Sequence, residues 1–353
     1  MALRFRSDSS AGIAASVLAA LAAANTPDAA LFGGDDVSQR LAHRLSEIFE
    51  RRVWAFPVVS GTAANAIGLA TLAAPGRAIL CHETAHIFDS EVGAVEFYAA
   101  GARLTPVAAR DGKLLPEAVA AALKAPDNPR GVGLPVAAVA VTQLTEWGTA
   151  YTPDELAAIA QLAHDHGALV HMDGARIANA VATLGCAPAD ITWRAGVDVL
   201  SFGGTKNGAM GADAIVVFEA SRAAAVAERA RRAGHRAAKL RYVAAQLDAL
   251  CAGDTWLAHA RHANSAAQRL AAGLLSIPGV EITRPPDGNL VFARLPEAVL
   301  ARLRAAGIEL WQWHTEPGRD AVYRLVTAFN TRMADVDQLI AAASAQHAAA
   351  AAG

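Results

Sequence analysis

The 353-residue chain is predicted to be an α/β protein with a mainly parallel sheet. Short, mostly apolar runs alternate with alanine- and leucine-rich helical stretches through its first two thirds. Such runs are typical of strands that helices bury on both faces. The composition is 54% hydrophobic and 18% charged, which supplies a large core and excludes a disordered chain.

The strands of this sheet are expected where apolar runs lie between helical stretches. Their positions are 78–81, 103–107, 136–142, 168–172, 197–202 and 214–218. The intervening stretch 153–166 is predicted to be a helix, because Thr152 is a good N-cap and Asp154 and Glu155 are acids in the first turn. Ligands of parallel sheets bind at the carboxyl ends of the strands, so functional residues are expected there.

The pattern changes near residue 250, where we place a domain boundary. Residues 1–250, including an N-terminal segment 1–30, are expected to form a large domain, and residues 251–353 a smaller α+β domain. The smaller domain is predicted to contain helices at 252–275 and 296–306 and strands near 280–283, 290–295 and 322–326. The alanine-rich tail 341–353 is expected to be the end of a helix.

The N-terminal segment has two interpretations, a secretory signal or a short amphipathic helix. Arg4 and Arg6 precede an apolar run at 11–24, as in a signal. The run is mostly alanine, which favours a helix capped by Ser10. The apolar positions of that helix would be Ile13, Val17, Leu18 and Leu21. No stretch reaches the roughly 20 apolar residues of a membrane span.

The charge and the cysteine content exclude several classes of protein. The 31 basic residues nearly balance the 33 acidic ones, which gives a net charge of −2 and no electrostatic basis for binding nucleic acid. Cys81, Cys186 and Cys251 are too few and too scattered for a disulfide framework or a cysteine-based zinc site. We therefore expect a cytoplasmic globular protein that binds neither nucleic acid nor a membrane.

Two segments place an acid and a lysine at the same edge of the predicted sheet. Asp173 follows the strand at 168–172, and Lys206 lies in a small-residue loop after the strand at 197–202. A pyridoxal phosphate site needs both groups: the lysine forms a Schiff base, and the aspartate keeps the pyridine nitrogen protonated. The alternative is that both residues are ordinary loop charges.

A run of small residues, Ser-Gly-Thr-Ala-Ala-Asn at 60–65, has the features of a phosphate-binding loop. It follows the apolar residues 56–59 and opens a predicted helix. Small residues let backbone N–H groups approach a phosphate, and the helix N-terminus adds its dipole. The same run is also a common N-cap, so it favours a cofactor site only in combination with Asp173 and Lys206.

These motifs resemble those of the threonine aldolases, which are fold-type-I pyridoxal phosphate enzymes of the β-eliminating lyase group. The resemblance extends from about residue 5 to residue 340 and is nearest to the bacterial low-specificity L-threonine aldolases and phenylserine aldolases. Its motifs stand at 6–8 (Arg-Ser-Asp), 32–35 (Phe-Gly-Gly-Asp), 60–65, 85–86 (Ala-His), 171–176 (His-Met-Asp-Gly-Ala-Arg) and 205–206 (Thr-Lys). The resemblance implies a large domain of the aspartate aminotransferase type, with a mainly parallel seven-stranded sheet, and a smaller C-terminal α+β domain.

The resemblance also implies a role for each motif residue. Lys206 would form the Schiff base, Asp173 would pair with the pyridine nitrogen, and His86 would stack on the ring and take part in proton transfer. The phosphate contacts would be Gly61, Thr62 and an Arg241 supplied by a partner subunit. The contacts to the substrate carboxylate and the ring oxygen would be Ser7, Arg176 and Arg324, since a planar guanidinium binds a carboxylate bidentately. No metal ligand is implied.

The activity implied by the resemblance is cleavage of L-β-hydroxy-α-amino acids to glycine and an aldehyde. Substrates would include L-threonine, L-allo-threonine and L-phenylserine. The family also implies a homo-oligomer built from dimers, usually a tetramer, with active sites at subunit interfaces. Elimination at the β-carbon, transamination and racemisation remain alternatives, because all of them start from the same cofactor-bound amino acid.

One segment departs from the family pattern. Residues 145–149 read Thr-Glu-Trp-Gly-Thr where many threonine aldolases carry a histidine near the substrate hydroxyl, and Trp147 stands in its place. Tryptophan cannot accept a proton, so removal of the hydroxyl proton would depend on His86, a water or another group. The enlarged apolar wall would favour aryl side chains on the β-carbon of the substrate.

A zinc-hydrolase pattern is a remote alternative. His82-Glu83-Thr84-Ala85-His86 matches H-E-x-x-H, which binds zinc when both histidines lie one turn apart on a helix and a third ligand follows. Here the pattern directly follows the strand at 78–81, and no metzincin-type third histidine follows it. We therefore expect His82 to lie in a turn.

Overall fold

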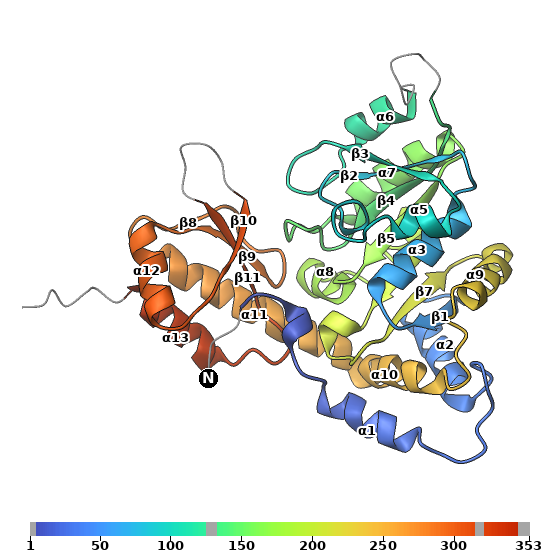
Figure 1. The fold of residues 1–353 in the computed structure, drawn as a ribbon, viewed down its shortest axis with the longest axis horizontal. Coiled ribbons are helices and arrows are strands. Elements are labelled where there is room, and N and C mark those ends of the chain that lie inside the picture. The colour runs from blue at the N-terminus through green and yellow to red at the C-terminus, as the bar shows by residue number, and fades with distance from the viewer. Residues whose placement is uncertain (1–4, 125–132, 315–320, 345–353) are drawn as a thin grey trace, which may run out of the picture.

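A seven-stranded sheet forms the larger part of the molecule, on the right of Figure 1. The computed structural model describes residues 5–124, 133–314 and 321–344. The strand order is β1-β7-β6-β5-β4-β2-β3, and β7 runs antiparallel to both of its neighbours while the other pairs are parallel. The predicted α/β class with a mainly parallel sheet is confirmed. The strands are β1 (Trp54–Val58), β2 (Ala78–His82), β3 (Arg103–Val107), β4 (Val136–Thr142), β5 (Leu169–Gly174), β6 (Val199–Gly203) and β7 (Asp213–Val217).

Helices cover both faces of this sheet, which explains why its strands are almost wholly apolar. Helices α2 (Asp36–Ile48), α7 (Pro153–Asp165), α8 (Ile177–Leu184) and α10 (Arg241–Cys251) contribute to the core on one face. Helices α3 (Gly61–Leu72), α5 (Ala94–Tyr98) and α9 (Ala220–Arg232) contribute to the core on the other. Short helices α4 (His86–Asp89), α6 (Pro116–Lys124), η2 (Trp193–Ala195) and η3 (Thr205–Asn207) connect the strands.

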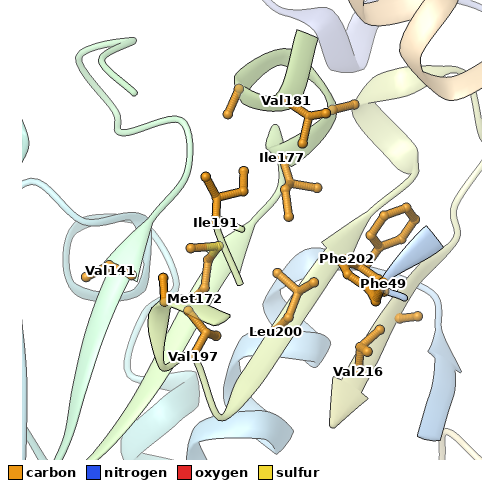
Figure 2. Close-up of a cluster of buried hydrophobic side chains, with 14 of the residues drawn as sticks. Phe49, Val141, Met172, Ile177, Val181, Ile191, Val197, Leu200, Phe202 and Val216 are labelled. Carbon is orange, nitrogen blue, oxygen red and sulfur yellow. The ribbon is translucent and has the colours of Figure 1, made fainter. Parts of the chain in front are cut away.

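The core beneath the functional edge of the sheet is closely packed. Met172 of β5 and Leu200 of β6 lie in the cluster that Figure 2 shows, together with Ile177 of α8. The ring of Phe49 meets Phe202 edge-to-face, with 6.2 Å between their centroids. Burial of each such side chain contributes about 1.5–3 kcal/mol. The strand that carries Asp173 and the strand that precedes Lys206 are therefore held firmly side by side.

The C-terminal unit contains an antiparallel four-stranded sheet in the order β10-β11-β9-β8, on the left of Figure 1. Helix α11 connects the two units, since its Trp256 lies in the core of the large sheet and its Leu270 in the core of the C-terminal unit. Phe5 also packs into the second core, and its carbonyl accepts a hydrogen bond from Val326 N (2.8 Å). The domain boundary near residue 250 remains a prediction. The elements of this unit are η4 (Ala252–Asp254), α11 (Thr255–Leu275), β8 (Glu281–Ile282), β9 (Leu290–Arg294), α12 (Glu297–Ala305), β10 (Trp311–His314), β11 (Val322–Val326) and α13 (Met333–Ser344).

The start of the first helix was predicted wrongly. Helix α1 (Ala15–Ala23) begins after Ala14, which offers no side-chain cap. Ser10 instead ends the short turn η1 (Asp8–Ser10), and its hydroxyl donates to the carbonyl of Ser7 (2.5 Å). Leu18, predicted to lie on the buried face, is 51% exposed. Among the described helices, none is long and apolar enough to span a membrane.

Two strands were not predicted. Strand β1 contains Pro57, which weakens a strand pattern, but it lies at an edge of the sheet, where proline is tolerated. Strand β10 is short and is also an edge strand. The tail at 341–353 was predicted to be the end of a helix. Helix α13 ends at Ser344, and the rest of the tail lies outside the described residues.

We expect Gly203→Ala to destabilise the functional edge of the sheet. Gly203 ends β6, and a methyl group there would lie 2.6 Å from the carbonyl oxygen of Ala175 and 2.7 Å from its Cα. These are backbone atoms, which cannot rotate away. The variant should lower the free energy of unfolding by about 1–3 kcal/mol, as measured by urea denaturation. Gly12→Ala is the control, since its added methyl meets no atom within 4 Å. Equal losses in the two variants would contradict the packing argument.

Candidate functional site

Two cavities lie at the carboxyl ends of the parallel strands and share three of their lining residues. The inner cavity has a volume of about 220 Å³ and the outer cavity one of about 600 Å³. Ser9, His86 and Lys206 line both of them. This is the edge of the sheet where the sequence predicted the functional residues.

The inner cavity brings together five residues that the sequence analysis singled out. They come from the start of α3, from α4, from the end of β5 and from the loop after β6. These residues are Gly61, Thr62, His86, Asp173 and Lys206.

One wall of the inner cavity is the N-terminus of α3. Ser60 caps this helix, because its hydroxyl accepts a hydrogen bond from Ala63 N (3.2 Å). No atom lies within 4 Å of the point where a side chain on Gly61 would begin, so this face of the helix end is open. An open helix N-terminus with exposed N–H groups suits a phosphate.

Asp173 is 5% exposed, and two donors fix the position of its carboxylate. Ala175 N donates to Oδ1 (3.0 Å), and Asn65 Nδ2 donates to Oδ2 (2.8 Å). Because the carboxylate also borders the inner cavity, it is placed to pair with a protonated ring nitrogen.

His86, which also lines the inner cavity, is held by a buried carboxylate. Its Nδ1 lies 2.9 Å from Glu91 Oε1, and Asn65 Nδ2 donates to the same oxygen (3.0 Å). This hydrogen bond is the main cause that raises the pKa of His86, and it outweighs the lowering effects of burial and of the Lys206 charge.

The loop that carries Lys206 is fixed by Asp213 of β7. Asp213 Oδ1 accepts hydrogen bonds from Gly204 N (2.9 Å) and Thr205 N (3.3 Å), and Oδ2 accepts one from the Thr205 hydroxyl (2.8 Å). Burial raises the pKa of Asp213 above its ordinary value despite these bonds. The backbone on the N-terminal side of Lys206 is therefore fixed to the neighbouring strand.

A buried ion pair stands at the outer cavity. Arg176 donates from Nε to Asp8 Oδ2 (2.7 Å) and from an Nη atom to Asp8 Oδ1 (3.1 Å). Asn289 Nδ2 donates to Asp8 Oδ2 as well (3.0 Å). Burial raises the pKa of Asp8, but the charges of Arg176 and Lys206 and these hydrogen bonds outweigh it, so the pKa lies below its ordinary value. Arg176 lines the cavity with two of its nitrogens bound to Asp8, and its contact with a substrate or cofactor remains a prediction.

The outer cavity also contains Arg324 and an aromatic cluster. The guanidinium of Arg324 lies 4.6 Å from the ring centroid of Trp313, and its Nε has no hydrogen-bond partner in the described part of the chain. Burial and the nearby positive charge of Arg176 lower the pKa of Arg324. The ring of Trp147 is 5.4 Å from that of Phe292 and 5.8 Å from that of Trp313.

The remaining predicted residues divide between the site and another surface. Ser7 lines the outer cavity, where its hydroxyl accepts a hydrogen bond from Ser9 N (3.2 Å). Arg241 does not reach either cavity of its own chain. Its Nε donates to the carbonyl of Ala24 (3.0 Å), beside a separate hollow of about 660 Å³. Its contact with the phosphate of a partner subunit remains a prediction.

The zinc-hydrolase geometry is not formed. His82 ends β2 while His86 begins α4, so the two histidines do not share a helix. The ring nitrogens of His82 contact the Thr84 hydroxyl (2.9 Å) and the carbonyl of Ala109 (3.2 Å). Within the described ranges, no group of three or more His, Cys, Asp or Glu side chains is placed to hold a metal ion.

Several residues of the site were given no role from the sequence, among them Asp8, Asn65, Asp213 and Glu91. Asp8 and Asn65 stand within the motifs at 6–8 and 60–65, so the motifs could have pointed to them. Asp213 and Glu91 carry no sequence signal, because their importance depends on partners that only the fold brings near.

Comparisons with known proteins identify the family. Residues 4–298 match the family model described as beta-eliminating lyase. The chain belongs to this family. It is 38% identical over 343 residues to a low specificity L-threonine aldolase of Pseudomonas sp. (strain NCIMB 10558), with 96% of each chain covered. It is 39% identical over 341 residues to one of Pseudomonas aeruginosa, with 95% of each chain covered.

A solved structure agrees with this assignment. A threonine aldolase of Leishmania major superposes with a TM-score of 0.89 at 25% sequence identity, and covers 96% of this chain and 98% of that one. The predicted resemblance to the threonine aldolases and the predicted fold type are confirmed.

We expect Asp8→Asn to destabilise this beta-eliminating lyase family member strongly at neutral pH. The substitution leaves Arg176 buried without its counter-charge, which should lower the free energy of unfolding by about 3–5 kcal/mol in chemical denaturation. Because the folded-state pKa of Asp8 is lowered, its charge stabilises the fold above the ordinary value of 3.8, and this contribution is lost as the pH falls through the folded pKa.

The control for Asp8→Asn is Asp337→Asn. Asp337 forms the same two-bond pair with Arg269, at 2.6 and 2.9 Å, but both side chains are about half exposed. Exposed pairs contribute little, so no measurable change in stability is expected. Similar effects of the two substitutions at pH 7 would show that burial does not govern the Asp8–Arg176 pair.

Proposed function

We propose that this protein is a pyridoxal phosphate-dependent aldolase that cleaves L-β-hydroxy-α-amino acids to glycine and an aldehyde. The observation that carries the proposal is the convergence of Lys206, Asp173 and the N-terminus of α3 on the inner cavity. The two Pseudomonas relatives, which are named low specificity L-threonine aldolases and match nearly the whole chain, support the same activity.

The donor set of the inner cavity fits the proposed cofactor. Lys206 would hold pyridoxal phosphate covalently, Asp173 would pair with its ring nitrogen, and Gly61 and Thr62 would hold its phosphate. When bound, the cofactor supplies an electron sink for the charge that develops at the α-carbon of the substrate.

The outer cavity fits the amino-acid substrate. Nε of Arg324 has no hydrogen-bond partner within the described ranges, so its guanidinium is the proposed anchor for the substrate carboxylate, with Arg176 and Ser7 beside it. His86 accepts the β-hydroxyl proton at Nε2, because its Nδ1 is bound to Glu91. The carboxylate of Glu146 lines the same cavity and interacts electrostatically with His86, so it favours the protonated imidazolium that results.

The aromatic cluster favours an aryl group on the β-carbon of the substrate. Trp147, Trp313 and Phe292 have ring centroids 5.4–5.8 Å apart, and Trp147 and Trp313 line the outer cavity. Aromatic rings bind one another by edge and offset contacts at this range of distances. L-Phenylserine is therefore included in the proposed substrate class with L-threonine and L-allo-threonine.

The protein is also proposed to act as a homo-oligomer built from dimers, in a tetramer. Three apolar side chains near α4 and α5 are exposed in the single chain: Phe88 (43%), Val92 (98%) and Phe97 (79%). Exposed apolar side chains that cluster on a surface are typical of protein–protein interfaces. The cytoplasm is the proposed location, since Cys81, Cys186 and Cys251 are all free thiols, as a reducing compartment favours.

The test of the proposed activity is an aldehyde-release assay with L-threonine, L-allo-threonine and L-phenylserine. Lys206→Ala is expected to abolish both aldehyde release and the visible absorbance of lysine-bound pyridoxal phosphate. Lys113→Ala is the control, because Lys113 binds Glu155 and lines neither cavity. Absorbance without aldehyde from the unmodified protein would redirect the assignment to elimination or racemisation. Retained turnover in Lys206→Ala would reject the role of Lys206.

The preference for aryl substrates depends on Trp147. Trp147→Ala removes one ring of the aromatic cluster and should lower kcat/KM for L-phenylserine about tenfold relative to that for L-threonine. Trp147→Phe keeps an aromatic ring and should largely keep the ratio. A ratio that is unchanged in Trp147→Ala would place the aryl group elsewhere in the outer cavity.

A further inference from the structure

A fully buried carboxylate lies behind His86. We propose that Glu91 is a positioning residue that fixes His86 as the proton acceptor of the reaction, and that Asn65 ties this pair to Asp173. The inference rests on the proposed function, since it concerns the group through which Glu91 acts.

The geometry is a continuous hydrogen-bonded chain across three elements. His86 Nδ1 lies 2.9 Å from Glu91 Oε1, and Asn65 Nδ2 lies 3.0 Å from the same oxygen and 2.8 Å from Asp173 Oδ2. The amide of Asn65 has two N–H groups, so one can point to each carboxylate. Asn65 of α3 thereby fixes the distance between Asp173, which is proposed to pair with the cofactor ring, and Glu91, which holds His86.

The first consequence is the tautomer of His86. An ionised carboxylate only accepts hydrogen bonds, so Nδ1 carries the hydrogen that is directed at Glu91. The free lone pair of the neutral ring is then on Nε2. His86 borders the outer cavity as well as the inner one, and its side chain is 39% exposed, so Nε2 is available to a substrate hydroxyl.

The second consequence concerns burial. The Glu91 side chain is 0% exposed, and both of its donors meet on Oε1, while Oε2 has no partner among the residues that the structure describes. Burial of a carboxylate with so few donors is costly. Its charge therefore faces the imidazole of His86 in an environment that screens it weakly.

The acidic groups around His86 act in the same direction, and Lys206 opposes them. Glu91 has the largest effect on its pKa, and Glu146 after β4 and Asp173 on β5 raise the pKa further, whereas Lys206 after β6 lowers it. The other acids that line the outer cavity are Glu83 and Asp89. The net effect is a raised pKa, which makes the ring a stronger proton acceptor once it is neutral.

The decisive variant is Glu91→Gln, which keeps the shape and an acceptor oxygen but removes the charge. The acid limb of the kcat/KM profile reports the deprotonation of the essential base in the free enzyme. Because Glu91 raises the pKa of His86, its removal should shift this limb to lower pH. Glu96→Gln is the matched control on α5, since Glu96 is not among the charges that act on His86, and it should leave the limb in place.

A second readout does not depend on turnover. The pH titration of the His86 ring can be followed by NMR in substrate-free holoenzyme with labelled histidine, and the signal is assigned by its loss in His86→Asn. The same downward shift is expected in Glu91→Gln, and no shift in Glu96→Gln. If Glu91→Gln does not fold, Glu91→Asp withdraws the carboxylate by one methylene and should shift the titration in the same direction by a smaller amount.

A double-mutant cycle separates a positioning role from a general structural one. If Glu91 acts through His86, then Glu91→Gln should reduce kcat far less in the His86→Asn background than in the unmodified enzyme. Full additivity of the two losses would overturn the inference.

The outcomes also separate this inference from the proposed function. An unmodified holoenzyme that releases no aldehyde from any of the three substrates would reject the proposed function, while the NMR titration would still test the link between Glu91 and His86. An active enzyme in which Glu91→Gln moves neither the pH limb nor the titration would reject the inference alone.

Discussion

The buried pair between Asp8 and Arg176 is the interaction on which the geometry of the outer cavity depends. Arg176 follows β5 of the large sheet, Asp8 belongs to the N-terminal segment, and Asn289, which also donates to Asp8, precedes β9 of the C-terminal unit. Asn289 donates in addition to the carbonyl of Thr327 (2.7 Å), directly after β11. One carboxylate therefore joins three parts of the chain that are far apart in the sequence.

This arrangement explains how the two cavities come to share a wall. The backbone shortly before Asp8 is bound to the C-terminal unit through the carbonyl of Phe5. The side chain of Asp8 is bound by Arg176, which follows β5 of the large sheet. Ser7 and Ser9, on either side of Asp8, are thereby placed at the cavities. Because Arg176 uses two nitrogens on Asp8, its guanidinium plane is fixed, whereas Nε of Arg324 has no hydrogen-bond partner among the residues that the structure describes. The two guanidinium groups thus have different surroundings despite their common charge.

The same edge of the sheet shows how far the sequence could be read. Asp173 and Lys206 were located correctly because a buried parallel strand has an unmistakable apolar pattern, and its carboxyl end is where ligands bind. The seven-stranded sheet followed from family resemblance, while β1 was missed because Pro57 interrupts its pattern. Ser10 was assigned the wrong role because local propensity favoured it as a cap, whereas its hydroxyl bonds to Ser7.

Glu91 illustrates what could not be predicted. It is one of 33 acidic residues, and nothing near it in the sequence distinguishes it from a surface charge. Its role depends on complete burial and on two donors from α3 and α4, which are tertiary facts. Asn65 was within a quoted motif, but the motif explained only the helix start, since the contact with Asp173 spans 108 positions of the chain.

The charge around the inner cavity bears on why an arginine from a second copy of the chain would be needed there. Three acids, Asp173, Glu91 and Asp213, line this cavity. Among the described lining residues, Lys206 is the one lysine and there is no arginine. A phosphate at the start of α3 would add further negative charge, which a helix dipole offsets only in part. Arg241 does not line the inner cavity of its own chain; it donates a hydrogen bond to the carbonyl of Ala24 and lies at a separate hollow beside α1 and α2. A second copy that supplies this guanidinium would neutralise the phosphate, so association of subunits and retention of the cofactor would be linked by the same charge.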